Sequence, residues 1–171
     1  MEPAGAGGCY STIQAAIDAA IPGDTIDVAA GTYAETLNIS KDNLSISGVD
    51  AALVTINVTG LAGSNSSGIY VTADGVTLEG LTVMSDGVAT SPRYGIKYGQ
   101  TTGGTLQHLE IQGIYRTGID LLDNDGMLLD DISTHDNGGN GIGMRDTINS
   151  TLQNITTYGN DWGGCARPNL Q

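Results

Sequence analysis

The residues best suited to chemistry are basic and aromatic side chains concentrated between residues 70 and 162. The chain has only six Lys and Arg residues among 171, and four of them lie in this stretch. Guanidinium groups pair with carboxylates or sulfates, and aromatic faces stack on flat apolar surfaces such as sugar rings. We therefore predict a substrate-binding surface for a polysaccharide made by Tyr70, Arg93, Tyr94, Lys97, Tyr115, Arg116, Asp120, Arg145 and Trp162.

A catalytic reading of the same region needs a base or a clamp for a uronate carboxylate. The candidates for that role are Lys97, Arg116 and Arg145. A carboxylate-rich calcium site is the candidate cofactor, and its candidate ligands are Asp120, Asp123 and Asp146. Hydrated turn acids and ordinary surface ion pairs, such as Lys97 with Asp120, account for the same residues without any ligand. Both interpretations stay open at the level of sequence.

The charge balance excludes two classes of partner. The formal net charge is −13, whereas nucleic-acid binding needs clustered positive charge and anionic membrane surfaces attract basic segments. No run of apolar residues is long enough to span a bilayer. Because acidic surfaces are common on secreted bacterial proteins, we expect the chain to be secreted or displayed at the cell surface.

These candidate residues must be positioned by a repeat of 23 residues. Glycines that open equivalent units recur at this interval, namely Gly95, Gly118, Gly141 and Gly164, and a longer unit begins at Gly68. Each unit contains two short segments in which apolar residues alternate, which is typical of strands with one buried face. Such short strands bury that face only when the units stack in register.

The repeat predicts a single all-β domain over residues 1–171, a right-handed parallel β-helix of about seven coils. Residues 24–67 are expected to form irregular first coils, and residues 68–171 regular coils that stop abruptly or belong to a longer solenoid. Residues 11–21 predict an amphipathic capping helix that covers the first coil. Ser11 and Gln14 are expected to form its capping box.

The last coil has no comparable cap in the sequence. An uncovered end of a solenoid seeks a partner, so we expect end-to-end self-association there. Cys9 precedes the capping helix and Cys165 lies in the last coil, so several strand spacings of about 4.8 Å separate them. We therefore predict no disulfide between them, since their Cα atoms would have to approach within about 7 Å. Cys165 is expected to be buried, because it occupies an Ile position of the repeat.

Residues 11–39 resemble the N-terminal cap and first coil of the pectate-lyase-like parallel β-helix superfamily, and residues 141–156 resemble its generic repeat. This resemblance implies the fold and an association with polysaccharides. It does not imply one activity, because the superfamily includes lyases, hydrolases, esterases, epimerases and non-catalytic surface proteins. Of the hydrolase signatures only Asp130-Asp131 is present, and the epimerase-like stretch 135–138 lacks the Asp-Pro-His motif of those enzymes.

The sequence thus favours a glycan-binding or structural solenoid without a complete catalytic motif. The alternative is a secreted polysaccharide lyase, or a related carbohydrate-active enzyme, that acts on an acidic glycan.

Overall fold

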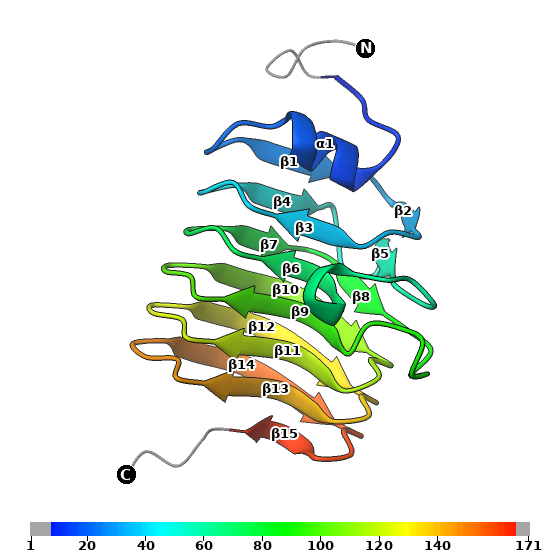
Figure 1. Ribbon diagram of the computed structural model, residues 1–171, viewed down its shortest axis with the longest axis vertical. Helices are drawn as coiled ribbons and strands as arrows, with labels where there is room; N and C mark the ends of the chain where they lie inside the picture. The colour runs from blue at the N-terminus through cyan, green and yellow to red at the C-terminus, as the bar shows by residue number, and fades with distance from the viewer. Residues whose placement is uncertain (1–7, 167–171) are drawn as a thin grey trace.

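A computed structural model describes residues 8–166 of the chain, which form a parallel β-solenoid of about six coils. The coils stack along the long axis of the molecule, with α1 (Ile13–Ala19) over the first coil and β15 at the far end (Figure 1). The expected all-β fold and its N-terminal helix are confirmed, although the described residues form about six coils where about seven were predicted.

Two sheets of parallel strands make up the walls. Sheet A has nine strands, which are β1 (Thr25–Val28), β2 (Gly31–Tyr33), β4 (Ser45–Gly48), β5 (Val54–Asn57), β7 (Thr77–Glu79), β8 (Thr82–Met84), β10 (Thr105–Gln112), β12 (Leu128–His135) and β14 (Thr151–Tyr158). Sheet B has six strands, which are β3 (Leu37–Ile39), β6 (Ser67–Val71), β9 (Tyr94–Gly99), β11 (Thr117–Leu122), β13 (Asn140–Arg145) and β15 (Gly163–Ala166). A short 3-10 helix, η1 (Ser64–Ser66), precedes β6.

Apolar ladders between the two sheets form the core. Ile69 pairs with Ile96, Ile96 with Ile119, and Ile119 with Ile142, each on the next strand of sheet B. All four side chains are fully buried. The 23-residue interval therefore places equivalent residues one strand spacing apart, as predicted, and each buried Ile or Leu contributes roughly 1.5–3 kcal/mol relative to an exposed one.

The capping helix is shorter than expected, and its N-terminus is satisfied differently. Thr12, not Ser11, is the N-cap, and its hydroxyl accepts a hydrogen bond from the Ala15 amide at 3.1 Å. The amides of Ile13 and Gln14 donate to the carboxylate of Glu35, both at 2.9 Å. The predicted capping box is wrong because Glu35, a charged acceptor, takes the Gln14 amide in place of the Ser11 hydroxyl, and the Gln14 side chain bonds to the backbone of Asn38.

The opposite end of α1 is held by a cation from the next coil. The Lys41 ammonium donates to the carbonyl oxygens of Ile17 and Asp18, both at 2.7 Å, and also to that of Ala20. An anion at the helix N-terminus and a cation at its C-terminus both interact favourably with the helix dipole. The helix is thereby fixed to the first coils by charge as well as by its apolar face. No helix within residues 8–166 has the length and apolarity needed to cross a membrane.

The last described coil is less buried than the others. Leu129 and Ile132 are 0% and 1% exposed, whereas their equivalents on β14, Leu152 and Ile155, are only partly buried. Cys165 pairs in register with Ile142 as expected, but it is exposed, so the prediction of its burial is wrong. The reason is that no further strand within residues 8–166 covers this position. Cys9 precedes α1 and Cys165 lies on β15, two elements at opposite ends of the solenoid (Figure 1). No disulfide joins the two cysteines.

Replacing one core residue tests the ladder. Ile119→Ala is expected to lower the free energy of unfolding by about 2–5 kcal/mol, because a buried ladder position is emptied between two covered neighbours. Urea denaturation followed by circular dichroism measures this change. Ile148→Ala is the matched control, since Ile148 is 56% exposed and its loss should change stability by less than about 0.5 kcal/mol. Equal effects of the two substitutions would contradict the ladder.

End-to-end association through the last coil stays a prediction. Light scattering over rising protein concentration should show dimers or longer assemblies. A monomer at every concentration would contradict it.

Candidate functional site

The middle of sheet B brings together three of the predicted surface residues. Tyr70 on β6, Lys97 on β9 and Asp120 on β11 are register partners, and Gly143 on β13 follows them. Their side chains share the outer face of the sheet, one strand spacing apart. The 23-residue repeat therefore located this row correctly, because parallel register keeps equivalent positions on one line.

Lys97 is held tightly within this row. Its ammonium lies 3.3 Å from Oδ2 of Asp120 and 4.5 Å from the centre of the Tyr94 ring. The Lys97 side chain is only 8% exposed and that of Asp120 19%. The pairing agrees with the sequence interpretation, but the burial does not. Period-2 alternation identifies an outward residue, and it carries no information about an aromatic ring that folds over it.

A second group lies in the turns that precede the strands of sheet B. The guanidinium carbon of Arg116 is 4.7 Å from the centre of the Trp162 ring, and Trp162 is 59% exposed. Nε of Arg116 is buried without a hydrogen-bond partner among the described residues. This stacking fixes the guanidinium plane beside an accessible indole, an arrangement that combines a cation with a flat apolar surface.

Gly139 makes the contact between Arg116 and Trp162 possible. These three residues occupy equivalent turns, 23 residues apart, and the Trp162 amide donates to the Gly139 carbonyl at 3.0 Å. A Cβ on Gly139 would lie 2.7 Å from the backbone oxygen of Arg116. Glycine is required here because its turn packs closely against the Arg116 backbone, and it places no side chain between Arg116 and Trp162.

Two asparagines position these turns, and the sequence analysis did not identify them. Asn137 accepts from the Ile114 amide at 2.9 Å, and its own side-chain amide donates to Oδ1 of Asn160 at 2.8 Å. Asn160 in turn donates to the Thr134 carbonyl at 3.0 Å. Stacked amides of this kind satisfy buried turn backbone. The signal was present in the sequence, since Asn137 and Asn160 are separated by one repeat.

The remaining predicted residues do not all join one surface. Arg93 is exposed and Tyr115 is 36% exposed, and both lie in turns leading into sheet B, near Tyr94 and Arg116. Arg145 is exposed at the other end of the strands, in register with Leu122. The predicted set thus divides into the turn group, the Lys97 row and an isolated Arg145.

The predicted calcium ligands are not assembled into a site. Asp123 and Asp146 are exposed in equivalent turns after β11 and β13, with φ of 53° and 51°. Asp120 is engaged by Lys97. Within residues 8–166 no three His, Cys, Asp or Glu residues are grouped so that they could hold a metal ion. Calcium binding therefore stays a prediction.

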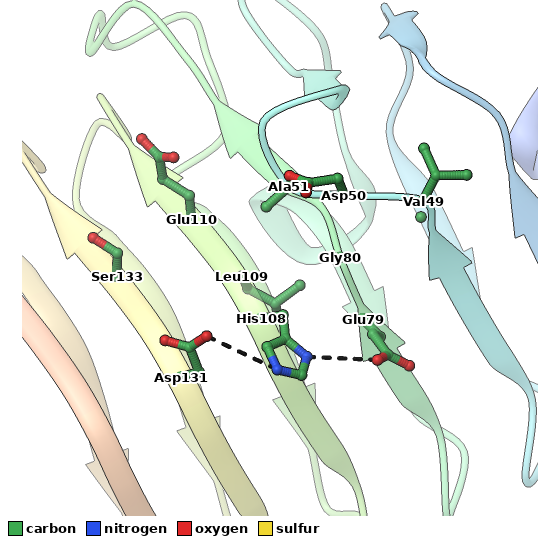
Figure 2. Close-up of a pocket in the computed structure, with 11 residues that line it drawn as sticks. Val49, Asp50, Ala51, Glu79, Gly80, His108, Leu109, Glu110, Asp131 and Ser133 are labelled. Carbon is green, nitrogen blue, oxygen red and sulfur yellow. Dashed lines mark ion pairs between the residues drawn. The ribbon is translucent and has the colours of Figure 1, made fainter.

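A hollow that the sequence analysis missed lies on sheet A. His108, Asp131 and Asn154 occupy one position of successive strands, with φ between 51° and 53°, so β10, β12 and β14 bend there. The bend encloses an acidic groove of about 400 Å³, lined by His108, Glu79, Asp131, Glu110 and their neighbours (Figure 2). His108 lies between two carboxylates, 3.5 Å from Glu79 and 3.9 Å from Asp131 (Figure 2).

The two faces of the solenoid therefore differ in charge. The face of sheet B and its turns carry Arg93, Lys97, Arg116 and exposed aromatic rings, whereas the acidic groove on sheet A carries mainly carboxylates. An anionic group is attracted to the first face and repelled by the second.

Comparison with solved structures shows the same fold in carbohydrate-active proteins. The mannuronan C-5 epimerase AlgE4 A-module of Azotobacter vinelandii matches with a TM-score of 0.58 and 18% identity, over 90% of this chain and 54% of that one. A pectin methylesterase in complex with a hexasaccharide matches with a TM-score of 0.52 and 16% identity, over 89% of this chain and 56% of that one. The pectin methylesterase of Aspergillus niger matches with a TM-score of 0.50 and 18% identity, over 98% and 90%.

The chain thus spans little more than half of the first two structures, and the low identities show a shared fold only. No curated protein sequence matches the chain. The family model described as "Right handed beta helix region" matches residues 67–166. This range contains the regular coils, the Lys97 row and the Arg116–Trp162 stack, and it is more than half of the sequence. The chain belongs to the right-handed β-helix family.

Proposed function

We propose that the chain is a polysaccharide-binding solenoid whose main contacts are Arg116 and Trp162. The observation that carries this proposal is the stack between them, which presents an exposed indole beside a fixed guanidinium. The indole face suits a sugar ring, and the guanidinium suits a carboxylate or sulfate on it. The structural neighbours, which include a pectin methylesterase in complex with a hexasaccharide and a mannuronan epimerase, support a glycan as the ligand.

An acidic glycan is favoured over a neutral one. Arg93 lies one repeat before Arg116, so the two cations recur along the solenoid axis at about one strand spacing. A chain molecule lying along this axis meets both of them in succession. Because the protein as a whole carries a net charge of −13, attraction is local and should weaken steeply as salt is added.

Binding without turnover is favoured over lyase chemistry by the state of Lys97. A general base needs access to the proton that it removes. The Lys97 ammonium is buried, paired with Asp120 and covered by the Tyr94 ring. It therefore stabilises sheet B and is not accessible to a substrate. Arg116, held against Trp162, is placed to bind an anionic group and not to remove a proton. A polysaccharide ligand also fits a secreted or cell-surface location, which forms part of this proposal.

The lyase alternative has a direct test. Incubation with polygalacturonate or alginate should give no rise in the ultraviolet absorbance of unsaturated uronates. A rise that is lost in Arg116→Gln or Arg145→Gln would favour the lyase.

Binding can be followed through Trp162, because it is the only tryptophan of the chain. Titration with polygalacturonate or alginate should change the tryptophan emission, and a neutral glucan should change it less. Arg116→Gln keeps the fluorophore and should weaken binding by about 3–30-fold, as expected for loss of a charge-assisted contact. Raising the salt concentration should weaken binding by the wild-type protein more than binding by Arg116→Gln.

A matched control uses an aromatic residue at the other end. Tyr10 is 37% exposed and lies beside the capping helix, so Tyr10→Ala should leave binding unchanged. Trp162→Ala, measured by calorimetry, should lose binding while keeping the circular dichroism spectrum. Wild-type affinity in Trp162→Ala would contradict the proposed site.

The Lys97 row predicts a stability effect that is separate from binding. Asp120→Asn leaves the buried ammonium without its counter-ion, which should lower the free energy of unfolding by about 1–3 kcal/mol. Replacing both partners, as in Lys97→Met with Asp120→Asn, should recover part of this loss. Urea denaturation measures both variants, and glycan affinity of the folded protein should stay unchanged. A loss of affinity in folded Asp120→Asn would show that this row contacts the ligand.

A further inference from the structure

His135 is the more enclosed of the two histidines, and no part of the proposed function uses it. It is the last residue of β12 and its side chain is 9% exposed. Nε2 lies 3.0 Å from Oε1 of Glu110, and Nδ1 lies 2.9 Å from Oδ2 of Asp136. Both ring nitrogens therefore face carboxylate oxygens.

This geometry selects one protonation state of the ring. A neutral imidazole has one N–H donor and one nitrogen lone pair, whereas an imidazolium has two donors. An ionised carboxylate only accepts hydrogen bonds, so a neutral His135 would satisfy one carboxylate and turn a lone pair toward the other. Only the cation makes both contacts favourable.

The same ring joins three successive coils. Gln112 on β10, His135 on β12 and Tyr158 on β14 are register partners. The Tyr158 ring stacks on His135, with the ring centres 4.6 Å apart and the planes inclined by 4°. The Gln112 side-chain amide donates to Oε1 of Glu110 at 3.1 Å, which fixes the same oxygen that His135 binds.

We propose that Glu110, His135, Asp136 and Tyr158 form a proton-dependent clamp that ties β14 to the coils before it. With the proton bound, the imidazolium bridges the two carboxylates under the Tyr158 ring. When the proton leaves, one carboxylate loses its donor and β14 loosens. Because Glu110 also lines the acidic groove of Figure 2, loss of the proton makes that groove more negative.

The pKa direction agrees with this geometry. Burial lowers the pKa of His135, but hydrogen bonds to Asp136 and Glu110, together with the charges of both, outweigh it and raise the pKa above its ordinary value. A pKa raised by folding stabilises the protein fully below the unfolded pKa of about 6.5, and this stabilisation disappears as the pH rises through the folded pKa.

Groups from every neighbouring element contribute to the electrostatic surroundings of the ring. Those that face it directly are Glu110 of β10, Asp136 in the following turn and Tyr158 of β14. Further charged or titratable groups along the same face of β10 and β12 are His108, Asp130 and Asp131.

The experiment observes His135 alone. His108 is the only other histidine, so His108→Gln leaves a single imidazole, whose ¹⁵N shifts are followed by NMR over pH. Both ring nitrogens should carry protons at pH 6, and the midpoint should lie above about 6.5, the value of a free histidine side chain. Glu110→Gln and Asp136→Asn should each lower that midpoint by about one pH unit.

Amide exchange tests the mechanical part of the clamp. In His108→Gln, protection of β14 should fall as the pH rises through the measured midpoint, after correction for intrinsic exchange. In His108→Gln combined with Glu110→Gln, the fall should move to lower pH together with the midpoint. A titration midpoint of His135 at or below 6.5 would overturn the proposal. Amide protection of β14 that does not change as the pH passes through this midpoint would overturn it too. These readouts need no glycan, so they stand apart from the binding proposal.

Discussion

The in-register stacking of identical strands is the constraint on which every other feature of this protein depends. Each short strand has unsatisfied backbone groups on both edges, and only the equivalent strand of the next coil pairs with them without a shift of register. Apolar contacts along the buried ladder stabilise the same register, and this ladder runs through Ile69, Ile96, Ile119 and Ile142. A slip by one residue would turn every core side chain outward. The outer surface is therefore specified by the inner one.

This constraint explains why glycines at outward positions help to shape a site. Outward positions of neighbouring coils lie about 4.8 Å apart, so each side chain is normally flanked by two others. Glycine at one position opens a gap whose walls are the coils above and below. Gly139 packs against the Arg116 backbone and places no side chain between Arg116 and Trp162, and Gly143 leaves room beside Asp120. In a solenoid, the choice of glycine on one coil thus decides which residues two coils apart can meet.

The sequence was sufficient to predict the fold and to predict which residues lie side by side on neighbouring coils, because both follow from periodicity. The 23-residue interval predicted that Lys97 lies beside Asp120 and that Arg116 and Trp162 share a wall, and the structure agrees. Periodicity says nothing about side-chain direction within a face, so the burial of Lys97 under Tyr94 was missed. It also misses partners from outside the repeat, as Glu35 at the start of α1 shows.

The acidic groove on sheet A was missed for a different reason. Its shape comes from left-handed backbone at His108 and Asp131. Glycine would have indicated such a conformation in the sequence, but His and Asp do not. A left-handed residue inside a strand bends the strand, and stacking repeats that bend on each coil. A conformational feature of a single residue thereby becomes a groove along the axis. Concave shape in a solenoid is consequently a property of backbone torsion at one repeat position, which hydrophobic alternation cannot reveal.

The separation of charge between the two faces follows from the same architecture. Sheets A and B are joined only through turns, and an apolar core lies between them, so ion pairs form within a face and not across the molecule. Lys97 and Asp120 neutralise each other on sheet B, and protonated His135 offsets part of the charge of its two carboxylates on sheet A. Arg93 and Arg116 lie on one wall, on the side of Trp162, whereas Arg145 is exposed at the other end of the strands of sheet B. A protein with a large negative charge can therefore offer one local surface to a negatively charged polymer, since distance and screening by salt limit the repulsion from the opposite face.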